Sequence, residues 1–355
     1  MLTSVLLPIA MSHPALCHGA IVYAAAQIAN IRGDVTPSKA DLQVYNRGLH
    51  SLHQSMLQQP NRFKDTLIIA AIAAAGFDLT YGRADELRRH VDGIANIIKS
   101  IGGLQYLGLG GLAAHLVLWI DFFAAIMLNR QPLYSIPSRP NITYPGPAPI
   151  YGSLVETTLS RITGGEDLSE PFTQTCRLTE LLEKIARDPG PSAEVEYFTY
   201  KRNQTDHLFA VANAKYFGTG SRLSCVSLAA VTLELWILHN VGDTHSIFHH
   251  LGIEIQKALM ATPLTEFWDS DLFLLQWVLF GAGSIMNDRN GSKWYQNVAR
   301  QTLLQQYGSD WPINWRDLQK QNLQRLIWSE LFLSLPFEAF CDKIWKLQQG
   351  EIGWK

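Results

Sequence analysis

Apolar residues recur every three or four positions along most of the chain, which is the spacing of amphipathic helices. The segment 36–57 has one such face, made of Leu42, Tyr45, Leu49, Leu52 and Met56. The segment 83–103 repeats the pattern and ends in two glycines, which are a strong signal for the end of a helix. No alternating strand pattern persists, and no repeat of fixed period is clear. The sequence therefore predicts an all-α fold.

Two segments are apolar on almost every face. The alanine-rich segment 64–79 predicts a central, buried helix. The second segment contains "LVLWIDFFAAIML" at 116–128, in which twelve of thirteen residues are apolar and Asp121 is the exception. Because His115 and Asp121 interrupt the apolar stretch, it is shorter than the roughly 18–20 uncharged residues that span a bilayer. We expect a core helix here and no contact with a membrane.

Prolines divide the chain into two parts. Six of the sixteen prolines lie between Pro132 and Pro149, and proline disfavours a continuous helix. We therefore expect one large multi-helix domain over residues 1–355. Its N-terminal helical half is 1–130, its proline-rich connector is 131–152, and its C-terminal helical half is 153–355. We expect the two halves to share one core.

The composition narrows the class of protein. With 355 residues and 47% hydrophobic content, the chain can bury a sizeable core. The net charge of −2 and the scattered basic residues are unlike those of a nucleic-acid reader. The four cysteines are widely spaced, the closest two being Cys176 and Cys225, 49 positions apart. That spacing excludes compact zinc motifs and a disulfide framework, and it predicts a reducing compartment, the nucleus or cytoplasm.

Four stretches, in this order, resemble landmarks of a known family. They are "LLPIAMSHPALCHGAIVYAAAQIA", "HVDGIANIIKSIGGLQYL", "LWIDFFAAIMLNRQPLY" and "FWDSDLFLLQWVLFGAGSIMNDRNGSKWYQ". Together they resemble the fungal-specific transcription factor domain, the effector region of many zinc-cluster regulators. The resemblance spans nearly all of the chain, and it assigns His90 a structural role.

This resemblance implies a transcription-regulatory protein. Regulators of the family bind DNA through a six-cysteine zinc cluster and a basic linker, and this sequence has neither. We therefore expect an effector without its own DNA-binding domain and without direct DNA binding. The resemblance further implies that it senses a hydrophobic small molecule, such as a sterol, or binds a protein partner, including a second copy of itself.

An enzyme on the same scaffold is the alternative hypothesis. The sequence contains no GxxxxGK[ST] or GxSxG motif and no GxGxxG that opens a helix after a strand, so we expect no cofactor. His245 and His249 lie four apart but lack the glutamate of an HExxH motif, so we expect no metal. The alternative is thus a cofactor-independent cyclase, isomerase or pericyclase of fungal secondary metabolism, guided by shape and one or two acid–base groups.

Asp121 has two interpretations. Its helix neighbours three and four positions away are all apolar, so any partner comes from another element, and the candidates are Arg88, Arg89, Lys99 and Tyr134. One interpretation, which we favour, is a structural ion pair or helix-end hydrogen bond. The other is a protonated acid in an apolar pocket. For the catalytic interpretation the candidate residues are Asp121, Tyr134 and His115, although His115 lies about 120° around the helix from Asp121.

The aromatic residues suggest a binding site. The chain has 10 tryptophans and 15 phenylalanines, most of which must form an ordinary core. A helical domain with this much aromatic surface can also enclose an apolar cavity. The candidate ligand-binding residues are Trp119, Phe122, Phe123, Trp236, Trp277 and Phe280.

Overall fold

The computed structural model describes most of the chain, with gaps in the N-terminal segment, in the connector and in several loops. The described residues are 7–34, 36–58, 64–136, 155, 158–159, 162, 164–188, 192–241, 245–261, 268, 271–286, 291–308 and 326–349. Within these ranges all regular secondary structure is helical, so the prediction of an all-α fold is confirmed. The connector expected at 131–152 lies outside the described residues from 137 onward.

The chain forms two compact units. The first is Met1–Ile136 with the short segment Thr244–Ile247, and the second is Pro137–Asp243 with Phe248–Lys355. The boundary at 136/137 falls within the expected connector. That the two units share one core stays a prediction.

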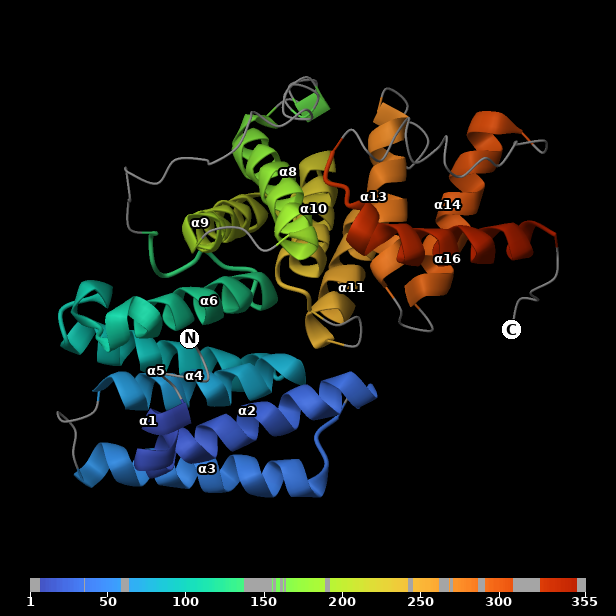
Figure 1. Cartoon of the computed structure of the whole chain (residues 1–355). Coiled ribbons are helices and arrows are strands. Elements are labelled where there is room, and N and C mark those ends of the chain that lie inside the picture. Colours follow the sequence, from blue (N-terminus) through green and yellow to red (C-terminus); the bar gives the residue numbers. More distant parts are fainter. Residues whose placement is uncertain are drawn as a thin grey trace. The chain divides into compact units, whose positions relative to one another are not determined.

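The first unit is a stack of helices, drawn from blue to green in Figure 1. Its α-helices are α1 (Leu7–Ser12), α2 (Pro14–Arg32), α3 (Lys39–Gln58), α4 (Lys64–Thr80), α5 (Ala84–Ser100) and α6 (Leu112–Met127), with short 3-10 turns η2 (Leu104–Tyr106) and η3 (Leu109–Gly111). Helix α4 packs against α2, α3, α5 and α6, and it is buried along nearly its whole length. The prediction of a central alanine-rich helix is thus confirmed, because small side chains let neighbouring helices approach on every face.

Glycine and serine mark two helix ends in the first unit. Gly33 ends α2 in the left-handed conformation. The segment that was expected to be helical from residue 36 begins its helix at Lys39, and Ser38 is its cap. The Asp41 amide donates to Ser38 Oγ and the Ser38 amide donates to Asp41 Oδ2. This reciprocal pair is a capping box, which local spacing alone did not single out.

Helix α6 together with η3 has the length and composition of a membrane span but the packing of a core helix. The segment Leu109–Met127 is long and apolar enough to cross a membrane, yet 56% of it is buried within the structure. It contacts both α4 and α5. The absence of membrane contact stays a prediction, and the packing agrees with the expected core helix.

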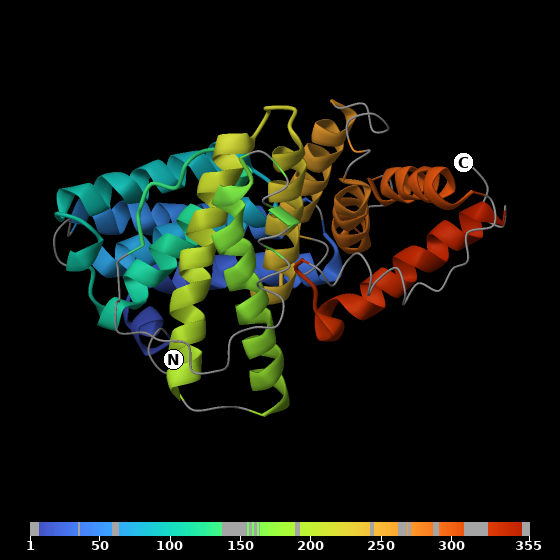
Figure 2. The same cartoon turned by 90° about the horizontal axis from the view of Figure 1, so that it is seen from above.

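The second unit is also helical and is drawn from green to red in Figures 1 and 2; its part of α11 begins at Phe248. Its elements are α8 (Glu166–Arg187), α9 (Ser192–Tyr216), α10 (Arg222–Leu238), α11 (Ser246–Met260), α13 (Leu272–Ile285), α14 (Gly291–Tyr307) and α16 (Glu330–Gln348). Helix α10 packs against α8, α9 and α13, and α13 also packs against α14 and α16. Figure 2 shows α8 and α9 side by side. Helices α10 and α13 are apolar on nearly all faces, which explains their central places.

Candidate functional site

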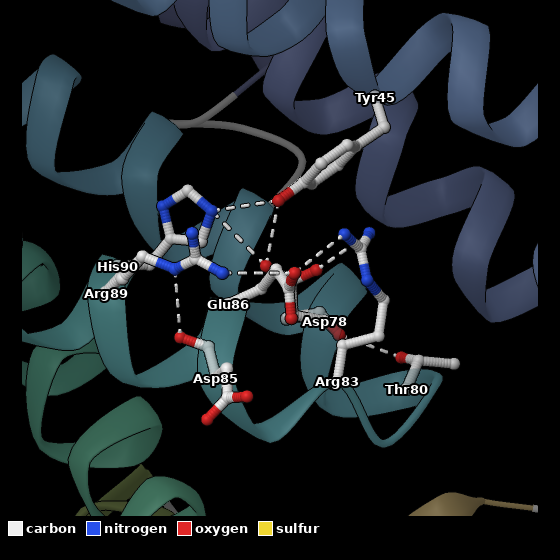
Figure 3. Close-up of polar contacts among 9 residues, drawn as sticks. Tyr45, Asp78, Thr80, Arg83, Asp85, Glu86, Arg89 and His90 are labelled. Carbon is white, nitrogen blue, oxygen red and sulfur yellow. Dashed lines mark hydrogen bonds and ion pairs between the residues drawn. The ribbon is translucent and has the colours of Figure 1, made fainter.

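A buried carboxylate, Asp78, ties three elements of the first unit together (Figure 3). It lies near the end of α4 and is 0% exposed. Tyr45 on α3 donates its hydroxyl to Asp78 Oδ2 at 2.9 Å. Arg83, in the turn before α5, places Nη1 3.2 Å from Asp78 Oδ1, and His90 on α5 places Nε2 3.2 Å from Oδ2.

Each oxygen of Asp78 has a close partner, Arg83 at Oδ1 and Tyr45 and His90 at Oδ2. A buried carboxylate is tolerated only when it is paired and hydrogen-bonded, and here Arg83 supplies the charge. Arg83 also lies over the Tyr45 ring at 5.2 Å and 3.5 Å from Glu86. Burial and the Asp78 charge raise the pKa of the Tyr45 phenol well above its ordinary value. Tyr45 is therefore a hydrogen-bond donor at neutral pH, and the geometry is that of a clamp between helices.

His90 completes this clamp. Its Nε2 lies 2.9 Å from the Tyr45 hydroxyl, and its ring meets the Tyr45 ring edge-on. These contacts agree with the structural role that the family resemblance assigned to it. The sequence analysis missed Tyr45, Asp78 and Arg83 as a group. One signal was present, because Asp78 follows a long run of apolar residues in α4, much as Asp121 lies among apolar residues in α6.

Asp121 forms a second polar centre, at the end of α6. Its Oδ1 accepts a hydrogen bond from Arg130 Nη2 at 3.1 Å. Its Oδ2 accepts from the backbone amides of Leu133 at 2.7 Å and Tyr134 at 3.1 Å. Both oxygens of the carboxylate are therefore occupied.

The residue that forms the ion pair with Asp121 differs from the candidates that the sequence offered. The ion pair is formed by Arg130, which follows α6, and not by Arg88, Arg89 or Lys99. Asn129 has a positive φ of 49°, and the Arg130 amide donates to Ala125 O at 3.0 Å. This left-handed cap turns the chain back over the helix end. Sequence spacing did not show it, because Arg130 lies nine residues from Asp121.

Burial outweighs the favourable contacts of Asp121, and its pKa is raised above the ordinary value. Burial raises the pKa of the Asp121 carboxyl, while the Arg130 charge and the two backbone amides oppose that rise. These contacts match the structural interpretation of Asp121. The catalytic interpretation stays a prediction.

The other two catalytic candidates lie apart from this pairing. His115 is half-buried, nearly two turns before Asp121 on the same helix. Tyr134 joins Asp121 through its backbone amide, not through its hydroxyl. That hydroxyl is buried and has no hydrogen-bond partner among the described residues. Burial and the Asp121 charge raise the pKa of Tyr134 to about 12.

Tyr134 lines a shallow groove on the first unit. The groove is bounded by the end of α5, the glycine turn after it and the segment beyond α6, and its residues are Ala95, Ile98, Lys99, Gly102, Gly103, Leu133 and Tyr134. Leu133 is 47% exposed there. The groove therefore combines apolar surface with one ammonium group, that of Lys99.

The predicted ligand-binding aromatics fall into separate clusters. In the first unit, Trp119, Phe122 and Phe123 pack on one another, with ring centroids 4.9 and 5.3 Å from Phe123. In the second unit, the Trp236 indole donates to Phe332 O at 2.9 Å and the Trp277 indole to Ile327 O at 3.3 Å.

Phe280, the sixth predicted residue, packs on Phe337 and Phe340. These contacts are those of core residues within each unit. A ligand-binding role for the six aromatics stays a prediction.

Comparison with known proteins gives a family match for the first part of the chain. Residues 1–153 match the family model described as the fungal specific transcription factor domain. No curated protein and no solved structure gives a significant match to the chain. The matched residues include the Asp78 centre, the Asp121 centre and the groove.

Proposed function

Because residues 1–153 belong to the fungal specific transcription factor domain family, we propose that the chain acts in the nucleus as an effector that regulates transcription. The family match is the observation that carries this proposal. It supports a regulatory role, and the finer mode of action below is our proposal alone.

We assign these 355 residues an effector role and not a DNA-reading one. Their four cysteines are too far apart for a zinc cluster, and their net charge is −2. A DNA reader neutralises phosphates with clustered lysine and arginine. A homodimer, another protein partner and the absence of direct DNA and membrane contact all stay predictions.

We place the regulatory contact at the groove beside Asp121. An apolar small molecule with one anionic or hydrogen-bond-accepting group fits its chemistry, since Leu133 offers exposed apolar surface and Lys99 offers an ammonium group. The Asp121–Arg130 pair holds the segment that carries Leu133 and Tyr134.

A tethering experiment tests the regulatory role. The whole chain is fused to an unrelated DNA-binding domain, and reporter transcription is measured in a fungal host. We expect reporter output to change relative to the DNA-binding domain alone. Unchanged output at normal protein abundance would count against an effector role.

A pair of matched variants tests the groove. Leu133→Asp places a charge in the groove, while Leu57→Asp changes a leucine on α3 that is 70% exposed. We expect only Leu133→Asp to abolish the reporter effect, with both proteins equally abundant. Equal effects of the two variants would remove the groove from the proposal.

The cofactor-independent enzyme stays a second prediction without specific support from the geometry. Both Asp121 oxygens already accept hydrogen bonds, so a catalytic proton transfer would have to break the turn that they stabilise.

A further inference from the structure

The second unit contains a buried cluster of two carboxylates and an imidazole. Asp206 lies on α9, Glu234 lies on α10, and His239 follows directly after α10 ends. One donor atom from each of the three side chains lies within 4.8 Å of the other two. The cluster is outside the residues that match the family model.

The three side chains are almost entirely buried. The side chains of Asp206 and His239 are 4% and 3% exposed, and His239 Nε2 lies 3.0 Å from Asp206 Oδ1. Glu234 is 0% exposed. Neither carboxylate oxygen of Glu234 meets a partner with hydrogen-bond geometry among the described residues, although the Asp206 carboxylate is its neighbour in the cluster.

Two adjacent buried carboxylates require a positive charge between them. Left without one, they repel each other in a medium of low dielectric constant, so one must take up a proton or both must bind a cation. Burial and the Asp206 charge raise the pKa of Glu234 well above its ordinary value. The Arg202 charge opposes that rise and also acts on Asp206, which in addition pairs with His239.

The donor set and its position suit a divalent metal. Two carboxylate oxygens and one imidazole nitrogen are typical zinc ligands, and a fourth position can hold water. Bonds of about 2.0–2.2 Å place tetrahedral donor atoms roughly 3.4 Å apart, so modest side-chain rotation closes the cluster. Glu234 and His239 also lie at the C-terminal end of α10, where the helix dipole favours a cation.

We infer that Asp206, Glu234 and His239 form a binding site for one divalent transition-metal ion of the zinc class. The site joins α9 to the end of α10. Its function in the protein is to cross-link these two helices, because each contributes at least one ligand. The sequence did not reveal it, since the ligands are 28 and 5 positions apart and form no local motif.

Direct metal titration tests this site. The full chain is freed of metal with a chelator and titrated with zinc chloride and, separately, manganese chloride by calorimetry. Bound metal is counted by elemental analysis. We expect one equivalent of zinc per chain and a rise in the melting temperature with zinc.

Variants assign the binding to these residues. Glu234→Gln keeps the shape of the side chain, and His239→Gln provides a second, independent substitution. We expect each to weaken zinc binding roughly 10-fold or more. Glu254→Gln, which alters a glutamate paired with Lys257 on α11, is the matched control and leaves binding unchanged.

Three results would overturn the inference. The first is the absence of stoichiometric binding by the folded full chain. The second is equal zinc affinity in wild type, Glu234→Gln and His239→Gln. The third is a wild-type melting temperature that does not respond to zinc, together with a higher melting temperature in Glu234→Gln. That result would show that a proton, not a metal, compensates the carboxylates.

Discussion

The Arg130 guanidinium lies 3.1 Å from the Asp121 carboxylate, and the same carboxylate accepts the backbone amides of Leu133 and Tyr134. One side chain thus binds both a charge and two amides of the chain that leaves α6. The carboxylate replaces the hydrogen bonds that the helix end and the following turn cannot make for themselves.

Removing this carboxylate should destabilise the first unit. Asp121→Ala loses three hydrogen bonds and leaves Arg130 and two amides without their acceptor, so we expect a loss of about 2–4 kcal/mol in the free energy of unfolding. Urea denaturation followed by circular dichroism measures it. Arg130→Met should cost less, because the amides of Leu133 and Tyr134 still solvate the carboxylate. If both variants unfold at the wild-type urea concentration, the pair has no structural role.

The close approach of α2 and α4 should make Gly76 irreplaceable. A Cβ at Gly76 would lie 2.9 Å from the Tyr23 ring, whereas a Cβ at Gly93 on α5 meets nothing within 4 Å. Alanine is the better helix former, so we expect Gly93→Ala to stabilise the protein by about 0.5–1 kcal/mol. Gly76→Ala should instead destabilise it by about 1–3 kcal/mol through overpacking. Melting temperatures compare the two variants, and equal shifts in one direction would contradict the packing shown here.

The Tyr45 hydroxyl should contribute to stability in a pH-dependent way. Tyr45→Phe loses the hydrogen bond to Asp78, and we expect a cost of about 1–2 kcal/mol at pH 7. Because burial and Asp78 raise the pKa of Tyr45 in the fold, the folded state retains the phenolic proton that the unfolded chain releases near pH 10. Stability therefore falls as pH rises above about 10.

The predicted loss of stability above pH 10 can be checked with the Tyr45→Phe variant. In Tyr45→Phe the loss of stability above pH 10 should be smaller than in wild type, as measured by urea denaturation at several pH values. An identical alkaline slope in both proteins would show that Tyr45 titrates normally.

The cysteines should differ sharply in reactivity. Burial raises the pKa of the Cys176 and Cys225 thiols to about 12 and that of Cys341 well above its ordinary value, and the thiolate is the reactive form. Cys17 is only half-buried. We expect maleimide at pH 7 to modify Cys17 alone in the native protein and all four cysteines in urea. Mass spectrometry of peptides reads the sites, and early modification of Cys225 would contradict the packing of α10.

Features that depend on residues close together in the sequence could be predicted, and features that depend on residues far apart in the sequence could not. The apolar periodicity of α3 and α5 and the continuous apolar character of α4 are local, so the sequence by itself determined an all-α fold and the buried place of α4 within the first unit. The stop at Gly33 is equally local, because the left-handed conformation favours glycine whatever surrounds it. The family resemblance likewise rests on ordered local landmarks, and it is confirmed over residues 1–153.

Tertiary structure alone decided the partners of the buried charges. The sequence marked Asp121 as unusual but could not name Arg130, because Asn129 first has to reverse the chain. Asp78 and Glu234 each meet side chains from other helices, and helix packing, not spacing, sets those distances. An acid among apolar helix residues therefore indicates that a partner must exist, since an unpaired buried charge is too costly. Only the fold decides which residue that partner is.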